Sequence, residues 1–126
     1  MRIRLLWSSG QIVARLVDSE ATKRLLHTLP YKSQAHVWGD EVYFAIPVHM
    51  ELQSDASDVV DPGSVCYWVA GKSLAIPFGP TPISKGMECR LADRVNLLGQ
   101  IEGDPQLLRK VQEGELIQVT RVKEPY

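Results

Sequence analysis

The stretch Asp61-Pro62-Gly63-Ser64-Val65-Cys66-Tyr67-Trp68-Val69 combines a turn with an apolar run near the middle of the chain. Proline fixes φ and glycine permits a positive φ, so Pro62-Gly63 predicts a tight turn. Residues 64–69 are apolar on nearly both faces, which is typical of a strand covered on two sides. We therefore expect this strand to lie inside a larger β structure.

Upstream of this strand, residues 41–46 alternate with a period of two. The residues on one face are apolar, and they are Val42, Phe44 and Ile46. Glu41 and Tyr43 share the opposite face, so we expect these two side chains to line one wall together. Trp38 precedes a predicted turn at Gly39-Asp40, which would bring its ring close to them.

Three further strand patterns lie downstream. Residues 75–78 form a short apolar run in which Pro77 cannot donate to a β-ladder, which predicts a sheet edge or the end of a strand. Residues 95–101 predict a strand that carries Val95, Leu97 and Ile101 on one side. Residues 116–122 predict a final strand.

The N-terminal segment predicts a hairpin followed by a helix. Apolar residues alternate through residues 3–7 and 12–16, on either side of the turn sequence Ser8-Ser9-Gly10. The helix is expected to begin at Glu20, with Asp18 or Ser19 as its cap, and to end at Pro30.

A second helix is predicted near the C-terminus, over residues 105–113. Asp104 is a good N-cap, Pro105 suits the first helical position and Gly114 is a C-terminal stop. Its expected buried stripe consists of Leu107, Leu108 and Val111.

Seven or eight short strands with two helices indicate a mainly β protein, built as a closed or nearly closed β-barrel with helices at its openings. The sequence has 126 residues, of which 44% are hydrophobic and 23% charged. This length and composition fit a single domain over residues 1–126.

Charge and composition argue against several classes of protein. The 14 Lys and Arg residues nearly balance the 15 Asp and Glu residues, so we expect no nucleic-acid binding. No apolar run reaches the roughly 20 residues that cross a bilayer, and the N-terminus does not read as a signal peptide. The two cysteines do not make a disulfide framework, which favours a cytoplasmic protein with no membrane attachment.

The sequence offers little for metal or covalent chemistry. The three histidines and two cysteines do not have the spacing that is typical of metal ligands. They are His27, His36, His49, Cys66 and Cys89. No nucleophile elbow or glycine-rich phosphate loop occurs. We therefore expect no metal and no cofactor, and the sequence does not identify catalytic residues.

Aromatic residues gather in one part of the chain. Six of the nine lie between residues 38 and 78, and they are Trp38, Tyr43, Phe44, Tyr67, Trp68 and Phe78. They are either core residues or the walls of an aromatic pocket. The adjacent stretch Phe78-Gly79-Pro80-Thr81-Pro82-Ile83-Ser84 is stiff because of its prolines, either of which could be cis. It is either a rigid turn or a lip that presents hydroxyl groups to a ligand.

Four segments together resemble a family of small bacterial and archaeal cyclophilin-like proteins of unassigned function. They are Trp38-Gly39-Asp40-Glu41-Val42-Tyr43-Phe44, Pro62-Gly63-Ser64-Val65-Cys66-Tyr67-Trp68, Phe78-Gly79-Pro80-Thr81-Pro82-Ile83-Ser84 and Val95-Asn96-Leu97-Leu98-Gly99. The resemblance implies a closed cyclophilin-type barrel of about eight strands with two helices. Prolyl isomerases of this fold carry a Phe-His-Arg segment, whereas here Ala45-Ile46-Pro47 follows Phe44.

Several functions stay open. The first is a binding module for a small molecule or a proline-containing peptide. Its predicted site consists of Trp38, Glu41, Tyr43, Tyr67, Trp68, Phe78, Thr81 and Pro82. The others are a divergent prolyl isomerase, a hydrolase-type enzyme with Glu41 as acid or base, and an accessory subunit of a bacterial amide-cleaving enzyme. The oligomeric state is not predicted.

Overall fold

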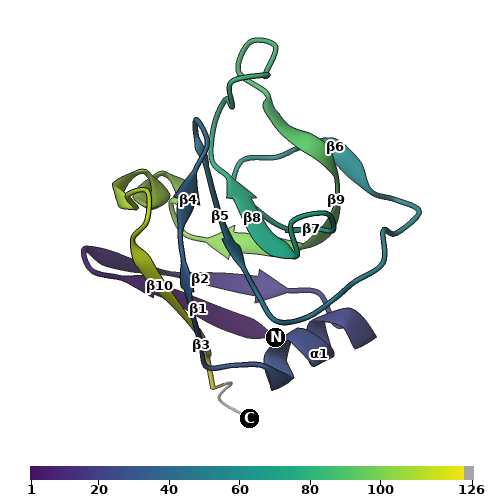
Figure 1. The fold of residues 1–126 in the computed structure, drawn as a ribbon, viewed down its shortest axis with the longest axis vertical. Coiled ribbons are helices and arrows are strands. Elements are labelled where there is room, and N and C mark those ends of the chain that lie inside the picture. The colour runs from purple at the N-terminus through teal and green to yellow at the C-terminus, as the bar shows by residue number, and fades with distance from the viewer. Residues whose placement is uncertain (124–126) are drawn as a thin grey trace.

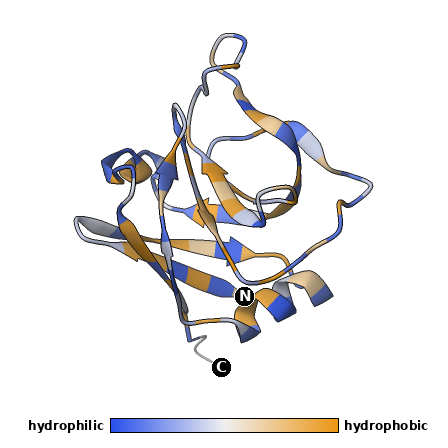
Figure 2. Ribbon diagram, viewed as in Figure 1, coloured by the Kyte–Doolittle hydropathy of each residue, from blue (hydrophilic) through white to orange (hydrophobic). Residues whose placement is uncertain are grey.

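The computed structural model describes residues 1–123, and one path of hydrogen-bonded strands runs through most of this part of the chain. The strands β1 (Arg2–Trp7) and β2 (Gly10–Leu16) form the predicted N-terminal hairpin. β1 also pairs with β10 (Leu116–Arg121), which pairs with β3 (Tyr31–Gln34). Hydrophobic and hydrophilic residues alternate along this hairpin (Figure 2), as the sequence pattern predicts.

The remaining strands continue from β2. The long strand β9 (Cys89–Glu102) joins β2 to β7 (Ser64–Trp68), and β8 (Ser73–Pro77) joins β7 to β5 (Glu41–Ala45). Two short strands complete the arrangement: β4 (His36–Val37) pairs with β5, and β6 (Ser57–Val60) pairs with β9. All pairs are antiparallel (Figure 1).

The strand path closes through the backbone. Its two ends, β3 and β4, are separated in the sequence by Ala35 alone. The Ala35 N–H donates to the carbonyl of Glu115 at 2.8 Å, and its carbonyl accepts from the N–H of Gly114 at 2.8 Å. The predicted barrel is therefore confirmed as a nearly closed barrel of strands.

The seven strand segments predicted from sequence all occur, and three short strands add to them. These are β3, β4 and β6, with the sequences YKSQ, HV and SDVV. Their residues are mostly polar or half-exposed, so they carry no clear alternation of apolar and polar side chains. Pro77 is the last residue of β8, which has a neighbour on each side, so it marks a strand end and not a sheet edge.

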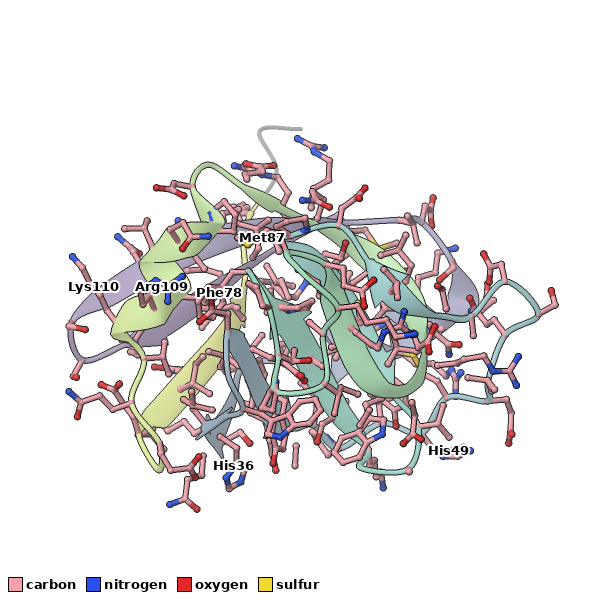
Figure 3. All side chains as sticks on the ribbon, turned by 90° about the horizontal axis from the view of Figure 1, so that it is seen from above. His36, His49, Phe78, Met87, Arg109 and Lys110 are labelled. Carbon is pink, nitrogen blue, oxygen red and sulfur yellow. The ribbon has the colours of Figure 1, made fainter. Side chains whose placement is uncertain are left out.

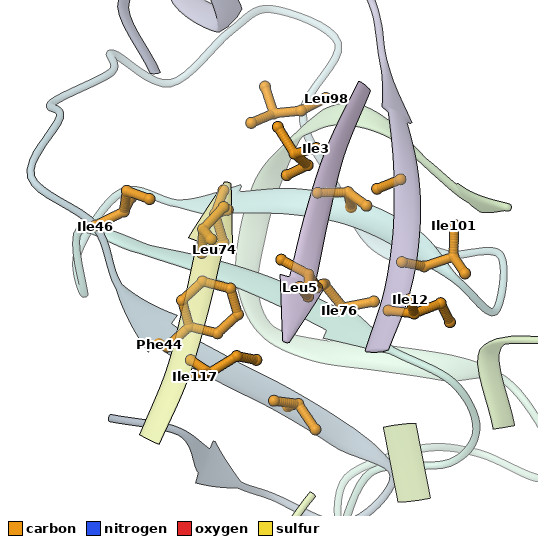
Figure 4. Close-up of a cluster of buried hydrophobic side chains, with 14 of the residues drawn as sticks. Ile3, Leu5, Ile12, Phe44, Ile46, Leu74, Ile76, Leu98, Ile101 and Ile117 are labelled. Atoms are coloured by element: carbon orange, nitrogen blue, oxygen red, sulfur yellow. The ribbon is translucent and has the colours of Figure 1, made fainter. Parts of the chain in front are cut away.

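The inside of the barrel is filled by aliphatic and aromatic side chains. Figure 4 shows residues from both halves of the strand path meeting there, among them Ile3, Leu5, Ile12, Phe44, Leu74, Ile76, Leu98 and Ile117. Val65 and Tyr67 of β7 belong to this core, whereas Cys66 belongs to a smaller cluster on the other face with Leu91 and Val95. β7 is therefore covered on both faces, as predicted.

The helix α1 (Glu20–His27) lies near the N-terminus in Figure 1. Ser19 is its cap: the Ser19 hydroxyl accepts from the N–H of Thr22 at 3.1 Å, and the Thr22 hydroxyl accepts from the N–H of Ser19 at 3.0 Å. Leu25 and Leu26 are buried against the barrel core. No helix within residues 1–123 combines the length and apolarity needed to cross a bilayer.

The second helix differs from its prediction. η1 (Pro105–Lys110) is a 3-10 helix, shorter than the expected segment, with Asp104 as cap and Pro105 at its first position. Three residues per turn place residues 105, 108 and 111 on one side. Leu108 and Val111 are accordingly buried, whereas Leu107 is 40% exposed, so its predicted place in the buried stripe is wrong.

The prediction for one face of β9 is also wrong. Val65 pairs with Gly99 and Cys66 pairs with Leu97, so Leu98 is an extra residue that makes a β-bulge. Leu97 therefore faces outward with Cys66 and is 52% exposed, while Ile101 lies in the barrel core. A bulge changes the alternation along a strand, and a period-two pattern does not predict it.

Candidate functional site

A cavity of about 140 Å³ lies on the outer face of β5, β7 and β8, beneath the first half of β9. The side chains that point away from the barrel core make its walls. They are Trp38, Glu41, Tyr43, Trp68, Ala75, Leu91, Ala92, Asp93 and Val95. Four of these are residues that the sequence predicts for a ligand site: Trp38, Glu41, Tyr43 and Trp68.

Two of the aromatic walls meet at a right angle. The rings of Tyr43 and Trp68 are T-shaped, with centroids 5.7 Å apart and an interplanar angle of 85°. The indole N–H of Trp68 donates to Oδ2 of Asp93 at 2.8 Å, which ties the ring to β9. His36 packs on Tyr43 with ring centroids 5.1 Å apart, and it does not line the cavity. These contacts hold the two walls in place before any ligand enters.

The third aromatic wall, Trp38, stands on a tight turn. The backbone N–H of Trp38 donates to the carbonyl of Glu41 at 3.0 Å. Gly39 within the turn has a φ of +58°, and an added Cβ would lie 2.8 Å from Cδ of Pro82 and 2.9 Å from Cα of Thr81. The turn therefore needs glycine for its conformation and for its close packing on the loop 78–84.

The loop 78–84 supports the site but does not line it. The N–H of Asp40 donates to the carbonyl of Pro80 at 2.9 Å. The hydroxyl of Thr81 donates to the carbonyl of Arg90, and the hydroxyl of Ser84 accepts from the N–H groups of Thr81 at 2.9 Å and Arg90 at 3.1 Å. Both hydroxyls are thus engaged within the protein. Among residues 1–123 the only cis peptide bond joins Leu29 to Pro30, outside this loop.

The other predicted site residues lie outside the cavity. Phe78 is buried in the barrel core, and the Arg109 guanidinium lies 5.1 Å from its ring centroid; Figure 3 shows the two together, apart from His36. Pro82 is exposed on the loop. Tyr67 is fully buried on the core face of β7, and its hydroxyl donates to the carbonyl of Val48 at 2.6 Å.

Glu41 is a buried carboxyl group at this cavity. Glu41 is only 6% exposed, and its Oε1 atom has no hydrogen-bond partner among the described residues. Burial raises the pKa of Glu41 from 4.5 to about 7, because desolvation penalises the charged form. Both the neutral and the ionised form of this carboxyl group are therefore accessible near neutral pH.

Cys66, on the outer face of β7, is unsuited to nucleophilic chemistry. Burial raises the pKa of the Cys66 thiol to about 12, with smaller contributions from the charges of Glu41 and Cys89. A thiol with this pKa is almost wholly protonated at neutral pH. In the part of the chain that the structure describes, no three His, Cys, Asp or Glu side chains are grouped to hold a metal ion.

The sequence pattern does not indicate the lining residues that the first half of β9 contributes. Leu91, Ala92 and Asp93 precede the strand that was predicted to begin at residue 95. The apolar alternation is interrupted there by exposed residues, so the pattern carries little signal. The pairing of β7 with β9 brings Asp93 to Trp68, 25 residues away in the sequence.

Known proteins similar to this chain share its fold. A family model described as "Cyclophilin-like" matches residues 1–120. The solution structure of the hypothetical protein AF2241 from Archaeoglobus fulgidus is 36% identical, with a TM-score of 0.82 over 97% of this chain and 95% of that one. The structure of McbB in complex with tryptophan is 19% identical, with a TM-score of 0.65 over 98% of this chain and 46% of McbB, and it shows the fold alone. Among curated proteins, none is a significant match.

Proposed function

The chain belongs to the cyclophilin-like family, and on this premise we propose that it is a binding protein whose aromatic cavity accepts a small molecule or one side chain of a peptide. The observation that carries the proposal is a preformed cavity in which Trp38, Tyr43 and Trp68 provide apolar walls and Glu41 provides one polar group. Ligand sites in proteins commonly combine apolar walls with a few placed polar groups.

The size of the cavity restricts its occupant. A volume of about 140 Å³ is close to that of an engineered apolar cavity, about 150 Å³, that binds benzene. One ring or one branched aliphatic group would fill it. A larger ligand would place one such group inside and leave the rest at the rim, where Ala92 and Asp93 are exposed.

A second candidate is an enzyme in which Glu41 transfers a proton. The observation that favours it is the pKa of Glu41 near 7, since a group with such a pKa is suited to acid–base catalysis at neutral pH. For prolyl isomerisation, however, no arginine is among the residues that line the cavity within residues 1–123. Stabilisation of a twisted amide would need another donor.

Thermal shift measurements with single-ring compounds test the binding proposal. A ligand that binds only the folded state raises the melting temperature. We expect a concentration-dependent increase for the wild type and none for Trp68→Ala, which removes one wall. Tyr67→Phe is the matched control, because Tyr67 lies on the opposite face of the same strand. Equal shifts in all three proteins would contradict binding in this cavity.

An isomerisation assay on a panel of Xaa–Pro peptides separates binding from catalysis. We expect no acceleration at high protein concentration. Acceleration that disappears in a Tyr43→Ala/Trp68→Ala double variant would overturn the binding proposal in favour of an isomerase. For any other acid–base reaction, Glu41→Gln should lower the rate by about two to four orders of magnitude.

A further inference from the structure

We propose that the cavity selects an organic ammonium group, with an N–H of the ligand donating to Oε1 of Glu41 and its apolar part lying against the three aromatic rings. This inference rests on the proposed binding function and adds the chemical class of the ligand.

The unpaired oxygen of Glu41 calls for a donor. Buried polar atoms in folded proteins nearly always have a hydrogen-bond partner, and each exception needs an explanation. Oε1 of Glu41 is such an exception among the described residues. The ionised form of Glu41 only accepts hydrogen bonds, so the group that would satisfy Oε1 in that form carries an N–H or O–H. Charge-assisted bonds are the stronger kind, which favours a protonated amine.

The charges around the cavity have one sign. Every charged residue among the described lining residues is acidic, namely Glu41 at the buried end and Asp93 at the exposed end. Three basic side chains lie on the surrounding strands. His36 lies 2.8 Å from Oε2 of Glu113, and Arg90 pairs with Glu88 and Asp58. Arg94 follows Asp93 on β9 and borders a separate hollow beside Trp68. Within the cavity lining, an anionic ligand would meet two carboxylates and no basic side chain, whereas a cation would meet no charge of its own sign.

The aromatic walls suit the same class of ligand. The face of a tryptophan or tyrosine ring attracts a cation within about 6 Å of its centroid. Tyr43 and Trp68 both line the cavity with their rings at 85° to each other, so a small cation there would lie beside two different rings. A cation in this cavity could interact both with the aromatic rings and with the carboxylate of Glu41. A neutral apolar ligand would interact with the rings alone.

Three ligands of one shape and different charge test this inference: benzylammonium, benzyl alcohol and benzoate. They are titrated into ¹⁵N-labelled protein at pH 8, where Glu41 is mostly ionised. The indole N–H signals of Trp38 and Trp68 report on the cavity. The signal of Trp7 is an internal control, because its Nε1 donates to Ser9 at the hairpin turn. Single Trp→Phe variants assign the three signals.

We expect benzylammonium to bind about tenfold more tightly than benzyl alcohol, and benzoate to bind most weakly. Glu41→Gln should remove most of the preference for the cation while leaving the affinity for benzyl alcohol little changed. Asp93→Asn, on the exposed rim, is a second variant that does not disturb the buried carboxyl group. It should weaken cation binding less than Glu41→Gln.

The outcomes separate this inference from the proposed function. If benzyl alcohol or benzoate shifts the Trp38 and Trp68 signals at concentrations equal to or lower than benzylammonium, the ammonium inference is overturned and the binding function stands. If none of the three probes shifts either signal, the inference and binding of single-ring ligands in this cavity both fail.

Discussion

Glu41 begins β5, opposite Pro77 of β8, with its side chain on the face away from the barrel core. At the scale of single residues, its buried carboxyl group makes the stability of the protein depend on pH. The folded protein retains a proton on Glu41 up to about pH 7, whereas the unfolded chain loses it near pH 4.5. Between these values the folded state binds more protons, so the free energy of unfolding falls as the pH rises, and it levels off above about pH 7.

Glu41→Gln should remove this dependence, because glutamine keeps the shape of the neutral acid and does not titrate. From the pKa of about 7, the contribution of Glu41 to the free energy of unfolding should drop by about 2–3 kcal/mol between pH 5 and pH 8. Urea unfolding of both proteins at the two pH values measures the difference. Parallel pH dependence in wild type and variant would contradict burial of an ionisable group at this position.

A variant of Tyr67 tests whether this side chain stabilises the core or contributes to ligand binding. Its hydroxyl donates to the carbonyl of Val48 at 2.6 Å, and the residue is fully buried. Tyr67→Phe would leave this carbonyl without its donor and should cost about 1–2 kcal/mol of stability. Ligand affinity in the cavity should not change. A loss of affinity with unchanged stability, measured by calorimetry and urea unfolding, would return Tyr67 to the ligand site.

Among the elements, β9 contains a bulge that determines which of its residues face the barrel core and which face outward, on either side of Leu98. Gly99 next to this bulge approaches β2 so closely that an added Cβ would lie 2.0 Å from the carbonyl oxygen of Arg15. The three nearest atoms belong to the backbone of Arg15 and Leu16 in β2, so none of them can move aside as the end of a flexible side chain would. The bulge thus depends on a residue without a side chain.

Gly99→Ala should therefore be strongly destabilising, by at least about 2 kcal/mol, because the β2–β9 pairing has to move. Gly103→Ala is the matched control: Gly103 has a φ of +84° but nothing within 4 Å of an added Cβ. It should cost only about 1 kcal/mol for the left-handed conformation. Urea unfolding of the two variants measures the difference, and equal losses would mean that the close approach to Arg15 is unimportant.

An element could be predicted where residues adjacent in the sequence specify it. The cap at Ser19 and the hairpin around residues 8–10 follow from local residue types, and both occur as predicted. The 3-10 geometry of η1 does not, because Asp104-Pro105 favours a helical start without choosing three or 3.6 residues per turn. The exposed Leu107 is the consequence.

At the scale of the whole molecule, a long connection without regular structure crosses from β5 to β6, over residues 46–56 (Figure 1). Asn96 of β9 holds it by two hydrogen bonds. Its Oδ1 accepts from the N–H of Gln53 at 2.8 Å, and its Nδ2 donates to the carbonyl of Glu51 at 2.8 Å. Asn96 is fully buried, so these bonds are shielded from water.

Hydrogen exchange should reveal this attachment. The amide of Gln53 is expected to exchange much more slowly than its exposed neighbours Leu52 and Ser54. Asn96→Ala should remove this protection and cost about 2 kcal/mol of stability, since it leaves two backbone groups unpaired. Unchanged protection of Gln53 in the variant would show that another contact holds the connection.

Local sequence patterns predict seven of the strand segments and show which side chains of β5 share a face. Both are local properties: period two places Glu41 and Tyr43 opposite Val42 and Phe44 without reference to the rest of the chain. Those two residues, with Trp38 beside its turn and Trp68 on a strand apolar on both faces, were accordingly predicted for the site and line the cavity.

Packing between strands that are distant in the sequence sets which face of each strand is inside the barrel and what covers the other. Tyr67 and Trp68 are adjacent and both aromatic, yet one lies in the core and the other lines the cavity. The choice depends on register with β8 and β9 and on one bulged residue, Leu98, far away in sequence. Burial of Glu41 has the same origin, because the strand that covers it begins 48 residues later, at Cys89.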